Sequence, residues 1–195
     1  MEKPVSGKEN GMKKILSGVL AIALFAGGAI AQSNAVSQSS SGNQKLQDRL
    51  SREVHHELVM IPDLTIFDNL AYKVDGGNIT LLGQVRNAVI KSQAEARVKN
   101  IEGAQSVNNE IEVLPPSPND DRIRRQVARA IFNDDRLFPY SMGALPPIHI
   151  IVKGGHVTLE GQVNTQADKD AAALRANTVP GVFSVENNLR VAKSS

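Results

Sequence analysis

Apolar residues recur along this chain at two different spacings. A spacing of four residues places side chains along one stripe of a helix. It predicts two helices, one through Leu46, Leu50, Val54 and Leu58 and one through Ile123, Val127 and Ile131. Two further helices are expected over Asn87 to Asn100 and over Thr165 to Thr178, and the last of these is rich in alanine.

Strands are predicted where apolar residues alternate with polar ones. In the first half of the chain, the side chains expected to face inward are Leu70, Tyr72, Val74, Ile79, Leu81, Gly83, Val85, Val107, Ile111 and Val113. In the second half they are Ile148, Ile150, Val152, Val185, Leu189 and Val191, and Gly161 is a structural glycine at the position of Gly83.

Glycines and polar caps mark the ends of these elements. Gly76-Gly77 and Gly154-Gly155 supply the positive-φ freedom that a tight hairpin turn needs. Gly103 and Gly181 are expected to end the helices that precede them. The helix through Ile123 is expected to be capped by one of the three residues Asn119, Asp120 and Asp121.

The two halves are copies of one another. Pairing each residue of 74–113 with the residue 78 positions later gives 16 identities in 40 positions. Upstream of the strands the offset is 73, so the second half carries five extra residues in the loop 138–147. Such a duplication indicates two structural units of one kind.

The order of elements is αββαβ, twice, and predicts an α+β fold. Each unit is expected to be a three-stranded sheet with two helices on one face. The predicted domains are residues 44–114 (repeat 1) and 119–193 (repeat 2), and the proline-rich residues 115–118 form a stiff linker between them.

The first residues are typical of a secretory signal peptide. Lys13 and Lys14 precede an apolar run that ends in Ala29-Ile30-Ala31. Residues 1–31 are therefore predicted to be a leader cleaved after Ala31, with Met12 as an alternative start, and residues 32–43 a flexible linker. The alternative is a retained membrane anchor, which the shortness of the run and its glycines disfavour.

Charge and cysteine content narrow the class of function. Without residues 1–31 the chain has 18 basic and 18 acidic residues, so it lacks the positive field of a nucleic-acid-binding protein. It contains no cysteine, which excludes disulfides, cysteine nucleophiles and a lipid-modified N-terminal cysteine. The expected location is the periplasm, as a protein that is not a lipoprotein.

The repeated motif resembles the BON domain family. It consists of Val-x-x-Gly-x-Ile/Val-Thr-Leu-x-Gly-x-Val followed by Gly-x-x-x-Val-x-Asn-x-Ile/Leu-x-Val, at Val74 to Val85 with Gly103 to Val113 and again at Val152 to Val163 with Gly181 to Val191. The resemblance implies a non-enzymatic envelope protein connected with osmotic stress, with anionic phospholipid as the leading candidate ligand.

Repeat 2 is the basic half, with 10 positive and 8 negative charges against 8 and 10 in repeat 1. Arg122, Arg125 and Arg129 share one face of its first predicted helix. Arginine presents a planar donor fork to phosphate oxygens, so this face is a candidate lipid site. The alternative is an ordinary solvated helix face whose arginines pair with Asp121, Asp134 or Asp135.

The extra loop of repeat 2 is unusually apolar, with Phe138, Tyr140, Met142 and Leu145 among its residues. Exposed beside the arginines, these side chains would form a wedge that binds a membrane surface or an envelope protein. The equal alternative is that they fill the contact between the repeats.

Catalytic and metal chemistry are not expected, and no cofactor is implied. Adjacent helical residues such as His55 and His56 diverge by about 100°, so they do not share a metal ion. The sequence therefore leaves two hypotheses for a binding protein: association with anionic phospholipid surfaces, or a protein-interaction or chaperone-like role in the envelope.

Overall fold

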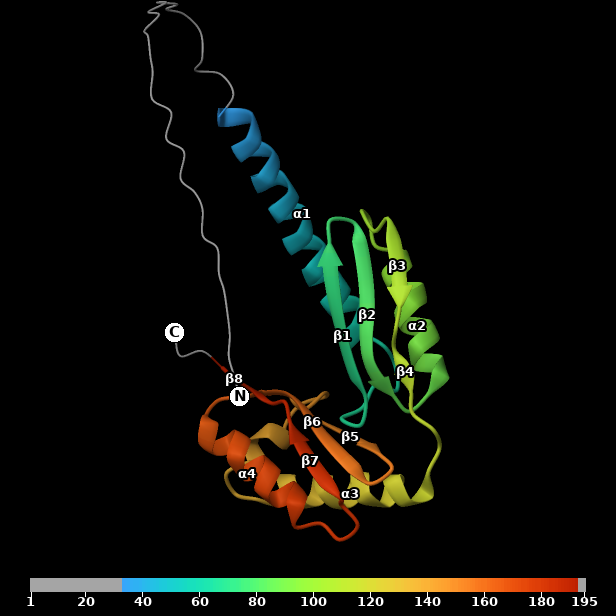
Figure 1. Ribbon diagram of the computed structural model, residues 1–195, viewed down its shortest axis with the longest axis vertical. Coiled ribbons are helices and arrows are strands. Elements are labelled where there is room, and N and C mark those ends of the chain that lie inside the picture. The colour runs from blue at the N-terminus through green and yellow to red at the C-terminus, as the bar shows by residue number, and fades with distance from the viewer. Residues whose placement is uncertain (1–32, 193–195) are drawn as a thin grey trace, which may run out of the picture.

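Both predicted αββαβ units are present in the computed structural model, which describes residues 33–192 (Figure 1). Repeat 1 contains α1 (Ser33–Val59), β1 (Asn69–Asp75), β2 (Asn78–Val85), α2 (Ala88–Lys99), β3 (Ser106–Asn109) and β4 (Glu112–Val113). Repeat 2 contains α3 (Pro118–Phe132), the 3-10 helix η1 (Phe138–Ser141), β5 (Ile148–Lys153), β6 (His156–Val163), α4 (Gln166–Asn177), β7 (Ser184–Asn187) and β8 (Arg190–Val191).

Each sheet combines an antiparallel hairpin with a parallel third strand. β1 pairs with β2 in antiparallel fashion, and β3 and β4 pair with β2 in parallel after the crossover through α2. The third strand is split because the Asn109 side chain accepts a hydrogen bond from the Ile111 N–H (3.2 Å), which interrupts the ladder. Repeat 2 has the same pairing, with β7 and β8 beside β6.

The apolar stripe of each first helix closes over its own sheet. Leu50 and Val54 are fully buried in repeat 1, as are Ile123 and Val127 in repeat 2. Each joins a separate core that also contains the second helix of its repeat. Burying a side chain of this size stabilises the fold by about 2 kcal/mol, so these stripes account for the helix positions.

Three of the four hairpin glycines have the predicted positive φ (Gly76, Gly154 and Gly155), whereas Gly77 does not. Gly76 and Gly154 turn the hairpins with φ near 58° and 59°. Gly83 and Gly161 have φ of 111° and 116°, and a Cβ at either position would collide with a carbonyl of the neighbouring strand or loop. Gly103 and Gly181 were predicted to end the helices, but the helices already end at Lys99 and Asn177, and the glycines form the following turns.

The ends of two helices differ from the prediction. The helix α1 begins at Ser33, so residues 33–43 are helical and are not a flexible linker, because lengthening an anchored helix costs far less than starting one. In α3 the cap is Ser117, whose hydroxyl accepts the Asp120 N–H, and Pro118 occupies the first turn. The predicted caps Asn119, Asp120 and Asp121 therefore lie inside the helix.

Val113 and Val191 pair in register with the buried Val85 and Val163, so they lie on the predicted core face but are incompletely covered. Both side chains are 38% exposed, because each ends a two-residue strand at the outer edge of its sheet. The predicted leader, its cleavage after Ala31 and the start at Met12 lie outside the described residues. Among residues 33–192, no helix has the length and apolar character needed to span a membrane.

Candidate functional site

The arginine face predicted on α3 is present and open to solvent. Ile123 and Val127 point into the core, whereas Arg122, Arg125 and Arg129 are all exposed. At 3.6 residues per turn the three arginines fall within an arc of about 60° around the helix axis. One face of α3 therefore carries three cations side by side.

Two of the three carboxylates expected to neutralise this face are engaged elsewhere. Asp121 pairs with the buried Arg124 at 2.6 Å, and Asp134 pairs with Arg175 of α4 at 2.7 Å, which lowers the pKa of Asp134. Arg122 donates to two neutral groups, the side-chain oxygens of Gln126 and Asn119. Within residues 33–192, no ion pair joins any of the three arginines to an acid.

The equivalent arginine of repeat 1 is neutralised. Arg49 lies 73 residues before Arg122 and pairs with Glu53 at 3.3 Å and with Glu102 at 3.6 Å. It also donates to the Glu102 carbonyl. The residues that correspond to these two acids in repeat 2 are Gln126 and Pro180, neither of which is charged. The same helix position therefore carries a neutralised arginine in repeat 1 and an arginine with only neutral partners in repeat 2.

The apolar loop of repeat 2 separates into exposed and packed residues. Phe138 and Met142 are 51% and 61% exposed, beyond the C-terminal end of α3. Tyr140 packs on the core of repeat 2, donates its hydroxyl proton to Asp168 (2.8 Å) and accepts the Asn164 N–H. Leu145 is half-buried beside the other repeat. The loop therefore has exposed residues, a tyrosine packed within repeat 2, and one leucine at the contact between the repeats.

Phe183 was not singled out from the sequence, although it is 74% exposed and is the most exposed large apolar side chain among the described residues. Its N–H donates to the Gly155 carbonyl, and its ring lies 5.9 Å from that of His156. The neighbouring turn contacts the arginine face, because a Cβ on Gly181 would lie 3.0 Å from Arg122 Nη2. The available signal was its alignment with Gln105 of repeat 1.

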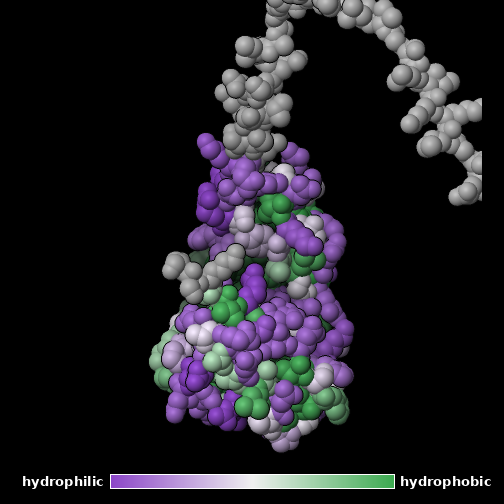
Figure 2. Space-filling model, turned by 60° about the vertical axis from the view of Figure 1, so that its left-hand side comes forward, coloured by the Kyte–Doolittle hydropathy of each residue, from purple (hydrophilic) through white to green (hydrophobic). Residues whose placement is uncertain are grey.

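Buried charges hold this corner of repeat 2 together. Asp120 is 3% exposed and accepts the N–H groups of Gly154 and Gly155, both at 2.9 Å. Arg124 is also 3% exposed and donates to the Val152 carbonyl. These contacts fix the start of α3 against the β5–β6 hairpin, so Arg122 and Phe183 are presented from a rigid base. The surface of repeat 2, at the lower end of Figure 2, carries hydrophobic patches separated by hydrophilic residues.

Two stretches of the chain, residues 47–115 and 119–193, match the family model of the BON domain. This chain belongs to the BON domain family. The outer membrane lipoprotein DolP of Haemophilus influenzae is 29% identical over 168 residues, which cover 84% of this chain and 83% of that protein. The osmotically-inducible protein Y of Escherichia coli (strain K12) is 25% identical over 204 residues, which cover 91% and 94%.

Among solved structures, the C-terminal domain of CdsD, a type III secretion protein of Chlamydia trachomatis, matches with a TM-score of 0.31 and 12% identity. The matched region covers 74% of this chain and 98% of that domain. The similarity is too weak to bear on fold or function.

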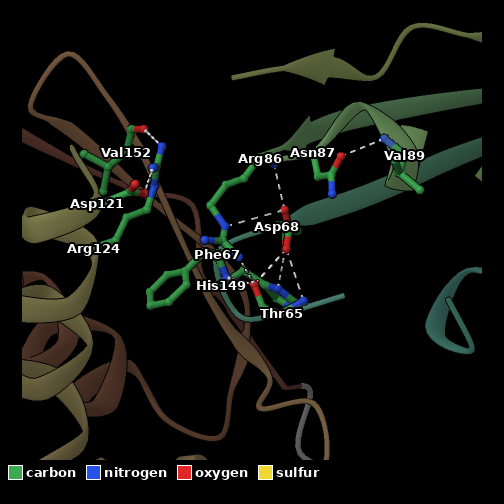
Figure 3. Close-up of polar contacts among 10 residues, drawn as sticks. All are labelled: Thr65, Phe67, Asp68, Arg86, Asn87, Val89, Asp121, Arg124, His149 and Val152. Atoms are coloured by element: carbon green, nitrogen blue, oxygen red, sulfur yellow. Dashed lines mark hydrogen bonds and ion pairs between the residues drawn. The ribbon is translucent and has the colours of Figure 1, made fainter. Parts of the chain in front are cut away.

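The two BON repeats contact each other through a loop of repeat 1 (Figure 3). Within that loop the fully buried Asp68 accepts the Arg86 N–H (2.8 Å) and the Thr65 hydroxyl (2.7 Å), which fixes the backbone. His149 of β5 contacts the Asp68 carbonyl through Nδ1 at 2.7 Å. Burial lowers the pKa of His149, and the hydrogen bond to Asp68 opposes this only in part.

Histidines and carboxylates do not gather into a metal site in the part of the BON chain that the structure describes. No group of three or more potential ligands from these residue types is found over residues 33–192. His55 and His56 lie next to each other on α1 but line two different hollows of the surface.

Proposed function

We propose that this BON protein acts by binding, as an exported envelope protein whose repeat 2 associates with anionic phospholipid surfaces. One observation carries the proposal: the acids that neutralise Arg49 in repeat 1 are replaced by Gln126 and Pro180 in repeat 2. Arg122 therefore lacks the acids that its counterpart has, and together with Arg125 and Arg129 it is available to phosphate groups, which arginine binds through its planar fork.

Exposed apolar side chains at the two ends of α3 offer a second means of attachment. Phe183 lies at the N-terminal end of α3, and Phe138 and Met142 lie beyond its C-terminal end. Apolar side chains inserted at the headgroup boundary add to the electrostatic attraction of basic residues for anionic lipids. Tyr140 contributes indirectly, since its bonds to Asp168 and Asn164 hold the loop in place.

The relatives support an envelope location. One has the name of an outer membrane lipoprotein and the other that of an osmotically inducible protein. This chain has no cysteine to carry a lipid, so we propose a periplasmic protein released by cleavage after Ala31, active in osmotic or envelope stress. N-terminal sequencing of the exported protein tests the cleavage: a first residue of Gln32 is expected, and an intact leader contradicts it.

Liposome flotation tests the lipid proposal. The protein is expected to float with vesicles that contain anionic phospholipid and to remain at the bottom with neutral vesicles. The triple substitution Arg122→Gln, Arg125→Gln and Arg129→Gln should abolish flotation. The matched control removes three exposed cations from repeat 1, with Lys45→Gln, Arg52→Gln and Lys73→Gln, and should float normally.

Three results count against the proposal: equal flotation with neutral and anionic vesicles, normal flotation of the arginine variant, or equal losses in the arginine variant and its control. The last result would show that net charge alone governs binding. A chaperone-like role is the second candidate, and a groove lined by α1, β1 and the loop 138–147 favours it.

A further inference from the structure

The outer edge of β5 is covered by the turn of repeat 1 that contains Ile66 and Phe67. The Ile150 N–H donates to the Ile66 carbonyl at 2.7 Å. Ile66 and Phe67 pack against the core of repeat 2, and the Arg86 guanidinium lies 5.3 Å from the centre of the Phe67 ring (Figure 3). The molecule thus shows what this edge of a BON sheet accepts: a main-chain carbonyl with large apolar side chains beside it.

The matching edge in repeat 1 is open. Tyr72 pairs with Leu81 in the same register in which Ile150 pairs with Leu159, so its N–H likewise points away from the sheet. No acceptor for this N–H lies within residues 33–192. An unpaired strand edge is a template for pairing with another chain.

Burial shows the same difference. Ile148, Ile150 and Val152 of β5 are fully buried. Their counterparts in β1 (Leu70, Tyr72 and Val74) are only half-buried, although they are apolar and belong to the core of repeat 1. The apolar positions of β1 therefore lack the cover that repeat 1 supplies to β5.

A groove of about 930 Å³ runs along the beginning of this open edge. Its apolar walls come from α1 (Leu58), from β1 (Leu70) and from the loop of repeat 2 (Leu145 and Pro147). Glu160 and Arg190 of repeat 2 also line it and contribute one charge of each sign. His149 also lines the groove, so it is continuous with the contact between the repeats. It shares no residue with the arginine face of α3, and its use is independent of lipid association.

We propose that this groove binds an extended, uncharged polypeptide segment with alternating apolar side chains, which adds to β1 as a further strand. Main-chain bonds to β1 would supply the affinity, and the apolar walls would select every second side chain. A lipid chain has no donors or acceptors for the strand edge. A segment of an unfolded or strand-forming envelope protein has both.

Amide hydrogen exchange of the ¹⁵N-labelled protein tests this proposal, with a seven-residue peptide that alternates valine and threonine as the probe. The Tyr72 and Val74 amides are expected to exchange at least about tenfold more slowly when the peptide is bound. The Lys73 amide faces β2 and is the internal control. Unchanged exchange at Tyr72 with saturating peptide, or protection confined to repeat 2, overturns the proposal.

Two N-methylated peptides make the test specific for strand addition. Methylation of alternate residues blocks one side of the peptide backbone only, so one of the two should lose binding and the other should keep it. Equal binding of both overturns the proposal. Tyr72→Pro removes the outward N–H and should abolish binding, whereas Tyr72→Phe should not. If Tyr72→Pro fails to fold, the peptide pair decides alone.

A second copy of the chain is the competing occupant. Sedimentation at increasing protein concentration distinguishes it: the proposal expects a monomer with an open groove. Self-association that slows Tyr72 exchange without any peptide would show that the edge serves dimerisation, and would overturn the proposal.

Discussion

The two BON repeats share a scaffold and differ in what they leave uncovered. Both keep the hairpin glycines, the apolar stripe of the first helix and the parallel third strand. Repeat 1 neutralises Arg49 and leaves the edge of β1 open, whereas repeat 2 has an exposed arginine face and a covered β5 edge. Duplication has preserved the core while the two surfaces have become different.

The largest effect is expected from the strand glycine that both repeats need. Gly161→Ala places a Cβ against the Pro147 carbonyl at a φ of 116° and should destabilise the protein by more than about 3 kcal/mol in urea unfolding. Gly143 has a similar φ of 106° with open space around it, so Gly143→Ala should cost only about 1 kcal/mol. Equal losses of unfolding free energy in the two variants would show that the contact with the Pro147 carbonyl is not the cause.

The buried Asp120 of repeat 2 has no charged counterpart in repeat 1. Asp120→Ala leaves the Gly154 and Gly155 amides without their acceptor and should cost about 2–3 kcal/mol in urea unfolding. The corresponding residue is Gln47, and Gln47→Ala should cost less than about 0.5 kcal/mol. Similar costs at both positions would show that the Asp120 contacts do not distinguish the repeats.

Restoring the acids of repeat 1 to repeat 2 should weaken lipid binding. A basic residue near an anionic membrane contributes about 1 kcal/mol, so Gln126→Glu with Pro180→Glu should reduce vesicle affinity by about 2 kcal/mol, roughly thirty-fold. The control adds the same charge to repeat 1, with Gln44→Glu and Gln105→Glu. An equal loss of vesicle affinity in the control would show that the arginine face has no specific role in binding.

The smallest effect is expected from pH at the contact between the repeats. The pKa of His149 is lowered from its ordinary 6.5, chiefly because burial disfavours the charged imidazole. The unfolded chain then binds this proton more readily than the folded one. The contribution of neutral His149 is therefore complete above about pH 6.5 and is lost as pH falls towards its folded pKa.

Urea unfolding at about pH 7.5 and about pH 5.5 measures this effect. His149→Gln should reduce the difference in unfolding free energy between the two conditions. An unchanged difference would show that other groups cause the pH dependence.

The scaffold was predictable from the sequence because it depends on local patterns. Four-residue and two-residue periodicity located the helices and strands, and the duplication made each half a check on the other. The start of α1 at Ser33 was missed because polar residues lengthen an anchored helix without any apolar pattern. The cap at Ser117 was missed because Pro115 to Pro118 looked like a linker.

The site was only half predictable. Helical spacing placed Arg122, Arg125 and Arg129 on one face, but their freedom from acids depends on Asp121 and Asp134 pairing with other arginines, which only the packing of α3 reveals. Covering of β5 by Ile66 joins residues of different repeats, and no local pattern encodes such a contact. The position of Phe183 was encoded in the repeat alignment but not in periodicity.

The most direct test of the difference between the repeats uses tryptophan reporters, since the chain contains no tryptophan. Phe183→Trp and Gln105→Trp place one fluorophore at equivalent exposed positions of repeats 2 and 1. With anionic vesicles, emission of the Phe183→Trp protein should shift to shorter wavelength, and that of the Gln105→Trp protein should stay unchanged. Equal shifts, or no shift at position 183, would contradict a lipid-binding surface on repeat 2.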